Sequence, residues 1–326
     1  MTESDAREAS LVDAFTTEPL AGNAAGVVPD AGGLTDEQMR AVARELSVSE
    51  TAFLHPSDEA DRAVRYFSPT TEVDLCGHAT IASHARLFER GTIEAGTHSL
   101  ETNVGVIDVE VAEGGRVWMS QNDPSIHEVE ESYERVGDAL GCDPNAMRDV
   151  GADLPLAYAS TGLPFLVVPV NFLEALGGMD PDLEAVAALA EDHDAAGVYA
   201  FTFDTLDADA TVHGRCFVPG VGIPEDPVTG TASGACGAYL GRFAAFDSGG
   251  GSVEDRATGD EGEEADDGHG TPDEMLFEQG HYVDRPGTVR VRAAGGGPPA
   301  VGGDAVTSFE GTISVPGSDE DDIIEA

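Results

Sequence analysis

The chain has 326 residues, 41% of them hydrophobic, which is enough for one large or two modest folded domains. It carries 62 acidic side chains against 16 basic ones, all of them arginine, and the formal net charge of -46 excludes nucleic acid and anionic membrane surfaces as expected partners. An acidic, lysine-free surface is typical of a halophilic protein that works in concentrated salt, where charge repulsion is screened, and this interpretation is favoured over specific cation binding.

The first part of the chain predicts short strands and two helices. Met1–Ser10 is acidic and has no apolar core, so we expect no signal peptide, and no apolar run predicts a membrane span. The segment Thr35-Asp-Glu-Gln38 is a capping box that begins a helix ending at Leu46, and a second helix is expected at 79–90, closed by Gly91. Strands are predicted at 11–15, 24–28, 50–54, 63–67, 99–102, 104–111 and 117–120.

The second part repeats this order of elements. The chain is expected to leave the first domain near 122–124, and helices are predicted at 129–140, 183–189 and 231–243. Strands are predicted at 155–160, 165–170, 197–202, 210–218, 275–277, 288–293 and 305–315. The recurrence predicts an internal duplication into two similar domains. Between 247 and 272 almost nothing is apolar, which predicts a disordered acidic insertion, and the tail at 318–326 is also expected to be loose.

A strand, turn and helix start occurs twice with the same order of parts. Arg65-Tyr-Phe-Ser-Pro leads to Gly77-His78-Ala79, and Arg215-Cys-Phe-Val-Pro leads to Gly230-Thr231-Ala232. Each helix start offers free backbone N–H groups and the positive end of a helix. Two such starts facing each other would hold a carboxylate, or the enolate-like charge that forms when a proton is removed beside one. Alone, each is an ordinary helix start.

Three titratable residues accompany these helix starts: Glu50, His78 and Asp226. Apolar strands around a carboxylate would raise its pKa above the usual value of about 4.3, which suits a group that shuttles a proton near neutral pH. Taken alone, a histidine is more often structural. A metal site at His78 is disfavoured because no H-x-x-x-H or H-E-x-x-H spacing accompanies it.

The cysteines, and the motifs that the sequence lacks, limit which kinds of catalysis remain to be considered. Four scattered cysteines without a C-x-x-C pair predict a reducing cytoplasm and no structural zinc. Cys76 stands at a helix start, where a thiol could act as a base or merely fill space, but Thr229 occupies the matching place in the second copy, so the two copies give no symmetric thiol pair. No G-x-G-x-x-G follows a strand, no P-loop is present, and no lysine could hold pyridoxal phosphate, so cofactor-free chemistry is expected.

Six ordered motifs resemble the phenazine-biosynthesis PhzF-like isomerases. They are Val12-Asp-Ala-Phe-Thr16, Gly22-Asn23, Ser49-Glu50-Thr51, Cys76-Gly-His-Ala-Thr80, Glu225-Asp-Pro-Val-Thr-Gly230 and Glu278-Gln-Gly280. The resemblance implies an α+β, duplicated diaminopimelate-epimerase-like fold: two pseudo-symmetric domains, each a curled mixed sheet around a central helix, with the active site in the cleft between. It places 9–121 with 305–316 in the first domain and 122–304 in the second, with the insertion at 247–272.

The resemblance also implies roles for residues. Glu50 matches the catalytic glutamate that takes a proton from one carbon and returns it at another, while His78 and Asp226 match groups that bind and polarise the substrate. Gly77, Gly230 and Thr231 match the helix-start backbone that holds its carboxylate or neighbouring polar groups, and Asn23 matches a lining residue. Thr231 departs from the serine that is frequent there.

The expected function is therefore a cofactor-independent isomerase, without metal, that moves a proton on a small carboxylate-bearing metabolite. As in the family, a homodimer is expected. Two alternatives stay open: a cysteine-dependent amino-acid epimerase or racemase, and a non-catalytic protein that binds small acids.

Overall fold

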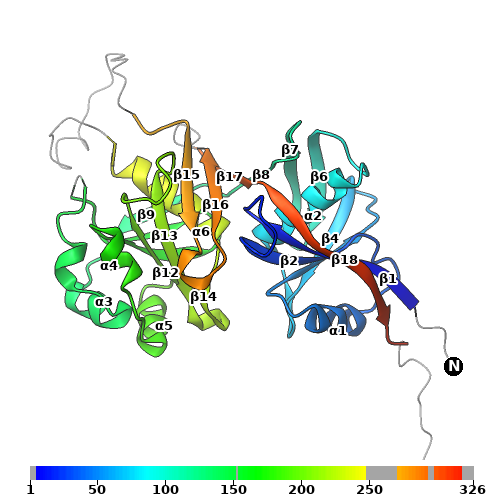
Figure 1. Cartoon of the computed structure of the whole chain (residues 1–326), viewed down its shortest axis with the longest axis horizontal. Helices are drawn as coiled ribbons and strands as arrows, with labels where there is room; N and C mark the ends of the chain where they lie inside the picture. The colour runs from blue at the N-terminus through cyan, green and yellow to red at the C-terminus, as the bar shows by residue number, and fades with distance from the viewer. Residues whose placement is uncertain (1–4, 152, 247–269, 293–296, 318–326) are drawn as a thin grey trace, which may run out of the picture. The chain divides into compact units, whose positions relative to one another are not determined.

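The computed structural model describes residues 5–151, 153–246, 270–292 and 297–317, which form a mixed α/β fold (Figure 1). The chain divides into two compact units. The first comprises Met1–Ser120, Asp284–Thr288 and Gly302–Ala326, and the second comprises Gln121–Val283 and Val289–Val301. The predicted acidic insertion, apart from Gly270 to Pro272, and the predicted loose tail lie outside the described residues.

The first unit is a mixed sheet with two helices. Its helices are α1 (Asp36–Leu46) and α2 (Gly77–Glu89). Its strands are β1 (Asp5–Ala14), β2 (Asn23–Val28), β3 (Thr51–His55), β4 (Arg62–Phe67), β5 (Glu72–Val73), β6 (Gly96–Thr102), β7 (Gly105–Val111), β8 (Val117–Ser120) and β18 (Ala305–Val315). The long strand β18 pairs antiparallel with β1, which pairs antiparallel with β2. The two distant ends of the chain therefore share one sheet.

In its described residues the second unit has more helices than the first. These are α3 (Tyr133–Leu140), α4 (Leu173–Gly177), α5 (Leu183–Asp192) and α6 (Gly230–Arg242), with 3-10 turns η1 (Pro144–Met147), η2 (Pro219–Val221) and η3 (His281–Val283). Its strands are β9 (Ser125–Glu128), β10 (Ala157–Ser160), β11 (Pro164–Pro169), β12 (Gly197–Thr202), β13 (Val212–Val218), β14 (Ile223–Asp226) and β15 (Glu274–Gln279). Strands β16 (Gly287–Arg292) and β17 (Ala300–Gly303) run across the boundaries between the units.

The same succession of strand pairings occurs in both units. In the first, β2 is parallel to β3, β3 is antiparallel to β4, and β4 pairs antiparallel with β5 and parallel with β6. In the second, β11, β12, β13, β14 and β15 repeat these four pairings in the same order. In each unit a largely buried helix follows a short strand: α2 follows β5, and α6 follows β14.

Both of these helices are largely buried, and many of their residues are small. In α2 the residues from Ala79 to Leu87 are buried against strands β1, β2, β3, β7, β8 and β18. In α6 the glycines bring strands close, since a Cβ added at Gly237 would lie 2.8 Å from a methyl carbon of Val291. The other helices cover outer faces: α1 packs Met39 and Val42 on Phe53, and α3, α4 and α5 share one core cluster with β11 and β12.

One predicted helix is wrong in its first part. The expected helix at 129–140 begins only at Tyr133, where the side chain of Ser132 accepts a hydrogen bond from the Arg135 N–H and caps it. Just before it, β9 pairs antiparallel with β10, and the Val129 N–H donates to the carbonyl of Leu156. Backbone pairing with a neighbouring strand therefore overrides the helical periodicity that begins at 129. The predictions also missed β5, β14, β17 and α4.

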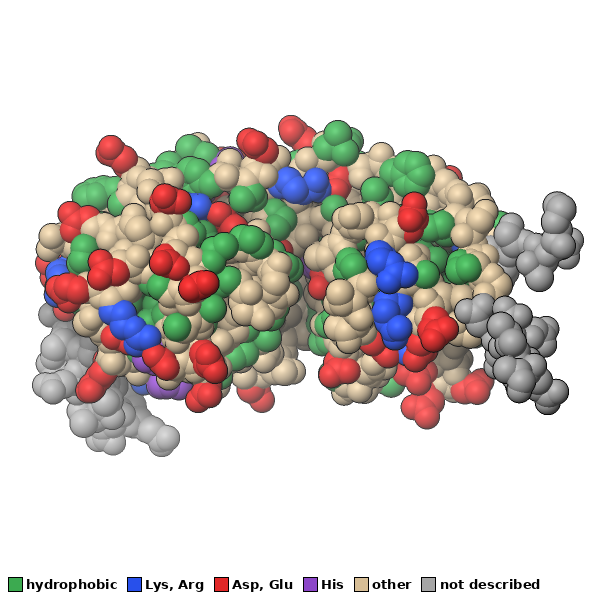
Figure 2. Space-filling view, turned by 90° about the horizontal axis from the view of Figure 1, so that it is seen from below, with side chains coloured by type: hydrophobic (Ala, Val, Ile, Leu, Met, Phe, Trp, Pro, Cys, Tyr) green, Lys and Arg blue, Asp and Glu red, His purple; other side chains and the backbone are tan. Residues whose placement is uncertain are grey.

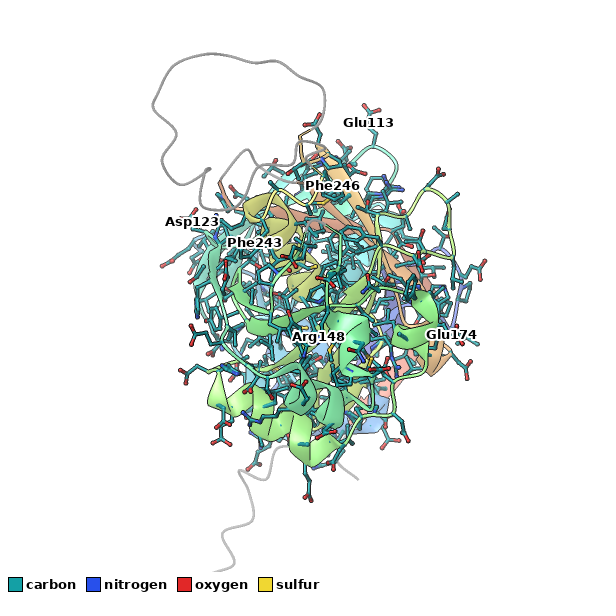
Figure 3. All side chains as sticks on the ribbon, turned by 90° about the vertical axis from the view of Figure 1, so that its left-hand side faces the viewer. Glu113, Asp123, Arg148, Glu174, Phe243 and Phe246 are labelled. Atoms are coloured by element: carbon teal, nitrogen blue, oxygen red, sulfur yellow. The ribbon has the colours of Figure 1, made fainter. Side chains whose placement is uncertain are left out.

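The acidic side chains lie mainly on the surface. Figure 2 shows Asp and Glu spread over the visible face, with few arginines among them. In Figure 3 the labelled side chains of Glu113, Asp123 and Glu174 point outward, whereas Arg148 lies 4.6 Å from the ring of Tyr133. In the described part of the chain no helix is both long and apolar enough to cross a membrane.

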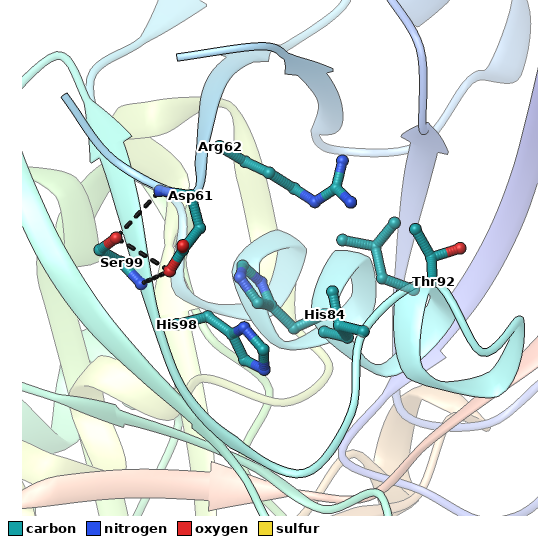
Figure 4. Close-up of a pocket in the computed structure, with 8 residues that line it drawn as sticks. Asp61, Arg62, His84, Thr92, His98 and Ser99 are labelled. Atoms are coloured by element: carbon teal, nitrogen blue, oxygen red, sulfur yellow. Dashed lines mark hydrogen bonds between the residues drawn. The ribbon is translucent and has the colours of Figure 1, made fainter. Parts of the chain in front are cut away.

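A hollow of about 270 Å³ lies in the first unit beside α2 (Figure 4). It is lined by Asp61, Arg62, His84, Leu87, Thr92, Ile93, His98 and Ser99. Asp61 is fixed at its rim by the Ser99 hydroxyl and N–H, and His84 is bonded through Nδ1 to the carbonyl of Thr80 at 3.0 Å. Burial lowers the pKa of His84 from 6.5 to about 4, because a charged imidazolium would lose its hydration there.

We predict that His84 makes the fold sensitive to acid. Because its pKa is lower in the folded than in the unfolded chain, the stability that it contributes is present above pH 6.5 and is lost as the pH falls toward 4. The loss amounts to at most roughly 3 kcal/mol. Urea unfolding at several pH values should show a shallower decline in His84→Gln than in the parent chain.

The control for this experiment is Ser83→Ala. Ser83 Oγ lies 3.4 Å from His84 Nδ1, so its loss disturbs the same place without removing a titrating group. It should shift the free energy of unfolding by a similar amount at every pH. If His84→Gln declines with the same slope as Ser83→Ala, the stabilising role of the neutral imidazole is wrong.

Candidate functional site

The start of α2 brings three chemically active side chains together in the first unit. Cys76 is the N-cap residue and makes no side-chain capping bond, and His78 is the second residue of the helix. Cys76 Sγ lies 3.4 Å from His78 Nδ1 and 4.0 Å from Nε2. The backbone beneath is held by Thr80, whose hydroxyl donates to the Cys76 carbonyl at 2.7 Å and contacts the hydroxyl of buried Tyr66 at 2.6 Å.

Glu50 reaches the same place from the start of β3. Its Oε2 lies 3.5 Å from His78 Nε2, and the hydroxyl of Ser49 lies 3.4 Å from the same nitrogen. The Glu50 carbonyl accepts a hydrogen bond from the Gly26 N–H, which joins this residue to β2. The side chains of Glu50 and His78 are 18% and 12% exposed, so both are largely enclosed while keeping some access to solvent. These two predicted site residues are therefore neighbours.

The other two first-unit candidates lie on α2 and on β2. Gly77 is the first residue of α2, and a Cβ there would meet no atom within 4 Å. Asn23 is 3% exposed and begins β2, which runs parallel to β3 with Gly26 opposite Thr51. Asn23 and Glu50 therefore stand at the amino-terminal ends of adjacent parallel strands. This is the end from which the Glu50 side chain meets His78.

The start of α6 in the second unit has a different set of groups. Asp226 ends β14, Thr229 is the N-cap residue, and Gly230 and Thr231 open the helix. The hydroxyl of Thr229 donates a short hydrogen bond to Oδ2 of Asp226. The carbonyl of Thr231 accepts from the hydroxyl of Thr161 at 3.4 Å. The structure thus groups three predicted residues, Asp226, Gly230 and Thr231, around one helix start.

Gln279 is a residue of this group that sequence reasoning missed. Its side chain is 1% exposed at the end of β15. Its Nε2 donates to the carbonyl of Asp226 at 2.7 Å and to the hydroxyl of Thr229 at 3.2 Å, and its Oε1 accepts from the Thr229 N–H at 3.2 Å. Because the Thr229 oxygen accepts from Gln279, its proton points to Asp226. The motif Glu278-Gln-Gly280 was the available sequence signal, but it carried no role for the amide.

The two helix starts carry groups with distinct chemical capacities. A carboxylate next to an imidazole can take and return a proton, with the histidine as hydrogen-bond partner. Free N–H groups at the first turns of α2 and α6 favour negative charge, as any helix start of this length does. The two starts differ in their side chains: a thiol and an imidazole in the first unit, an acid and hydroxyls in the second.

The mixed α/β fold presents an enclosed carboxylate–histidine pair at a helix start, and comparison with known proteins identifies the family. Residues 12–311 match the sequence model of the PhzC-PhzF family, described as phenazine biosynthesis-like protein. The chain belongs to this family, and it is an isomerase.

Curated relatives cover about 70% of the chain. It is 40% identical over 236 residues to the uncharacterized isomerase YfhB of Bacillus subtilis, covering 71% of this chain and 80% of the relative. It is 42% identical to an uncharacterized isomerase of Deinococcus radiodurans, over 70% of this chain and 74% of that one. Both relatives are named as isomerases, and neither name states a substrate.

Solved structures extend the likeness to nearly the whole chain. A PhzF-family phenazine biosynthesis protein of Bacillus anthracis has a TM-score of 0.78 and 33% identity, covering 95% of this chain and all of the other. A hydroxyproline epimerase of Agrobacterium vitis has a TM-score of 0.53 at 16% identity, covering 95% and 91%, which shows a shared fold alone. The fold is thus of the PhzF and epimerase-like type.

We predict that Thr229 and Gln279 stabilise the second helix start as one unit. Thr229→Val removes the hydroxyl between Asp226 and Gln279 and should lower the free energy of unfolding by about 1–3 kcal/mol, because two enclosed polar groups lose a partner. Thr229→Ser keeps the hydroxyl and should cost clearly less. The measurement is chemical unfolding of both variants under identical conditions.

A double-mutant cycle separates this network from simple packing. Thr229→Val combined with Gln279→Leu should cost less than the sum of the single variants, since the second change removes the group that the first left unpaired. Strictly additive costs would contradict a shared hydrogen-bond network.

Proposed function

We propose that the chain is a cofactor-independent isomerase that moves a proton on a small carboxylate-bearing metabolite. The observation that carries this proposal is the Glu50 carboxylate, 3.5 Å from His78 Nε2 and largely enclosed at the start of α2. Membership of an isomerase family supports the same class of reaction. The substrate is a carboxylic acid whose proton lies beside a group that can stabilise the resulting negative charge.

In this proposal each site residue has one role. Glu50 removes the proton from one carbon and delivers it to another, while His78 and Asp226 bind and polarise the substrate. Backbone N–H groups of Gly77, Gly230 and Thr231 hold its carboxylate, and Asn23 lines the site. The Thr229 hydroxyl donates a hydrogen bond to the Asp226 carboxylate and so holds it in place. In this position the carboxylate accepts a hydrogen bond from a donor group of the substrate and orients it.

The proposal predicts that Glu50 is required for proton exchange. Small carboxylic acids incubated with the chain in deuterated water should gain deuterium at one carbon, detected by mass spectrometry. Glu50→Gln should slow this exchange by about 10²–10⁴-fold, because the amide keeps the shape and loses the base. Exchange that persists at the parent rate in Glu50→Gln would sink the proposed role.

A matched control comes from a second carboxylate–imidazole pair in the chain. Glu131 Oε2 lies 3.3 Å from His193 Nε2 in the second unit, where both side chains are largely enclosed, and Glu131 also pairs with Arg135. Glu131→Gln should leave exchange unchanged. If both glutamine variants lose exchange equally, a general loss of folding rather than of a base is responsible.

A second candidate is a cysteine-dependent amino-acid epimerase. It is favoured by the contact of 3.4 Å between Cys76 Sγ and His78 Nδ1 at the helix start. The N-cap residue of α6 is Thr229, so a second thiol base is lacking at the corresponding place. Cys76→Ser discriminates the two functions: full exchange activity favours the glutamate mechanism, and lost exchange with Glu50→Gln still active favours the cysteine mechanism.

We also propose that the two compact units arose by duplication and are pseudo-symmetric epimerase-like domains, each with its sheet curled around α2 or α6. Their four shared strand pairings support this. So do matching side-chain bonds, since Thr80 donates to the Cys76 carbonyl and Ser233 donates to the Thr229 carbonyl in the same helical position. We further propose a cytoplasmic homodimer, for which light scattering of the purified chain gives the mass.

The charge of the chain leads to a proposal about its solvent. We propose that it is a halophilic protein, because 62 acidic side chains repel one another unless salt screens them. Raising potassium chloride from about 0.1 M to about 1 M shortens the Debye length from about 10 Å to about 3 Å, so the melting temperature should rise. An equally concentrated neutral osmolyte is the control. A melting temperature that falls or stays constant with salt would contradict it.

A further inference from the structure

We propose that Glu50, Cys76 and His78 together form a binding site for a soft divalent cation of the Zn²⁺ class. Each residue offers one ligand atom, and the three atoms lie within 4.8 Å of one another. The sequence spacing hid this cluster, because 26 positions separate Glu50 from Cys76 and no metal motif spans them. The fold brings the residues together at the start of α2.

The distances come close to those of a tetrahedral zinc site. With Zn–S near 2.3 Å and Zn–N near 2.0–2.1 Å, neighbouring ligand atoms lie about 3.3–3.6 Å apart. Glu50 Oε2 is 3.5 Å from His78 Nε2, and Cys76 Sγ is 4.0 Å from the same nitrogen. Small side-chain rotations would therefore let all three residues bind one ion, with His78 contributing Nε2.

The ligand set selects the class of metal. A thiolate, an imidazole and a single carboxylate favour Zn²⁺ and similar soft or borderline ions, whereas Mg²⁺ and Ca²⁺ need more oxygen ligands. Three protein ligands leave a fourth tetrahedral position for water or for the carboxylate of a small acid. When Cys76 binds the ion, its thiol proton leaves to solvent, so the bound sulfur is a thiolate.

Occupation of this site has a consequence that rests on the proposed function. A Glu50 oxygen bound to zinc cannot accept a proton from the substrate, and His78 Nε2 cannot donate a hydrogen bond to it. Zinc should therefore inhibit the isomerase by occupying its base. The thiol of Cys76 then acts as the residue that makes the site sensitive to soft metals, whether or not it takes part in proton transfer.

The test measures metal binding directly on the full-length, metal-stripped chain. Zn²⁺ is titrated in competition with a chromogenic chelator, and Co²⁺ is added separately to detect a thiolate-to-cobalt charge-transfer band. The parent chain should bind one tight equivalent and show the band. Cys76→Ser should bind Zn²⁺ at least about tenfold more weakly and lose the band.

Matched variants separate the cluster from the acidic surface. Cys142→Ser removes a partly exposed thiol elsewhere, and His193→Asn breaks the carboxylate–imidazole pair with Glu131. Both should bind Zn²⁺ as the parent does, whereas Glu50→Gln should weaken binding while keeping the charge-transfer band. Equal affinity in the parent and Cys76→Ser, or no tight equivalent in the parent, would overturn the proposed site.

The inhibition experiment distinguishes the site from the function. If zinc binds with the expected pattern and exchange of deuterium into a carboxylic acid falls in proportion, the site and the proposed role of Glu50 both stand. If zinc binds in this pattern but does not reduce exchange, the metal site stands and the proposed role of Glu50 fails. Exchange that falls equally in the parent and in Cys76→Ser overturns inhibition through this cluster.

Discussion

The arrangement of both helix starts depends on an arginine–glutamate pair beneath each of them. Arg65 donates to both carboxylate oxygens of Glu72 at 2.7 and 2.6 Å, and Arg215 does the same to Glu225 at 2.9 and 2.8 Å. Each pair ties a long strand to the short strand that precedes the buried helix. In the first unit the Arg65 hydrogen bonds lower the pKa of Glu72, so the pair stays ionised well below neutral pH.

These two ion pairs have a better-defined geometry than an ordinary surface ion pair. The guanidinium fork meets both oxygens at once, which fixes direction as well as distance. Arg215 is further enclosed: it donates to the carbonyls of Leu176 and Met179 and lies 4.9 Å from the rings of Phe217 and Tyr282. The turn before α6 is therefore built on a rigid base.

The two helix starts present different side chains on matching backbone positions. Cys76 and Thr229 are both N-cap residues that make no capping bond, and both are followed by glycine. In the first unit the sulfur contacts the imidazole of His78, whereas in the second the hydroxyl is directed to Asp226 by Gln279. The same backbone thus presents a soft, titratable group in one unit and a hard, fixed donor in the other.

Local signals in the sequence were sufficient for much of the fold. The capping box of α1 forms as predicted, with Thr35 and Gln38 bonded to each other's backbone, and β12 and β18 have the predicted bounds. Where the predictions failed, pairing with a distant strand decided the structure: β9 is a polar segment that becomes a strand only against β10, and the two-residue β5 exists only against β4. Such partners leave no periodic pattern in the segment itself.

The same reasoning applies to the candidate site. Glu50 and His78 were predictable from motifs, because each occurs in a short segment with its own signal. The role of Gln279 was not, since its three hydrogen bonds join β15 to a turn 50 residues earlier. The cluster of Glu50, Cys76 and His78 likewise depends on the parallel pairing of β2 with β3 and on the burial of α2. The residues to which we assign the base are therefore also those of the proposed metal site, because the Cys76 sulfur and a Glu50 oxygen lie 3.4 and 3.5 Å from the two ring nitrogens of His78.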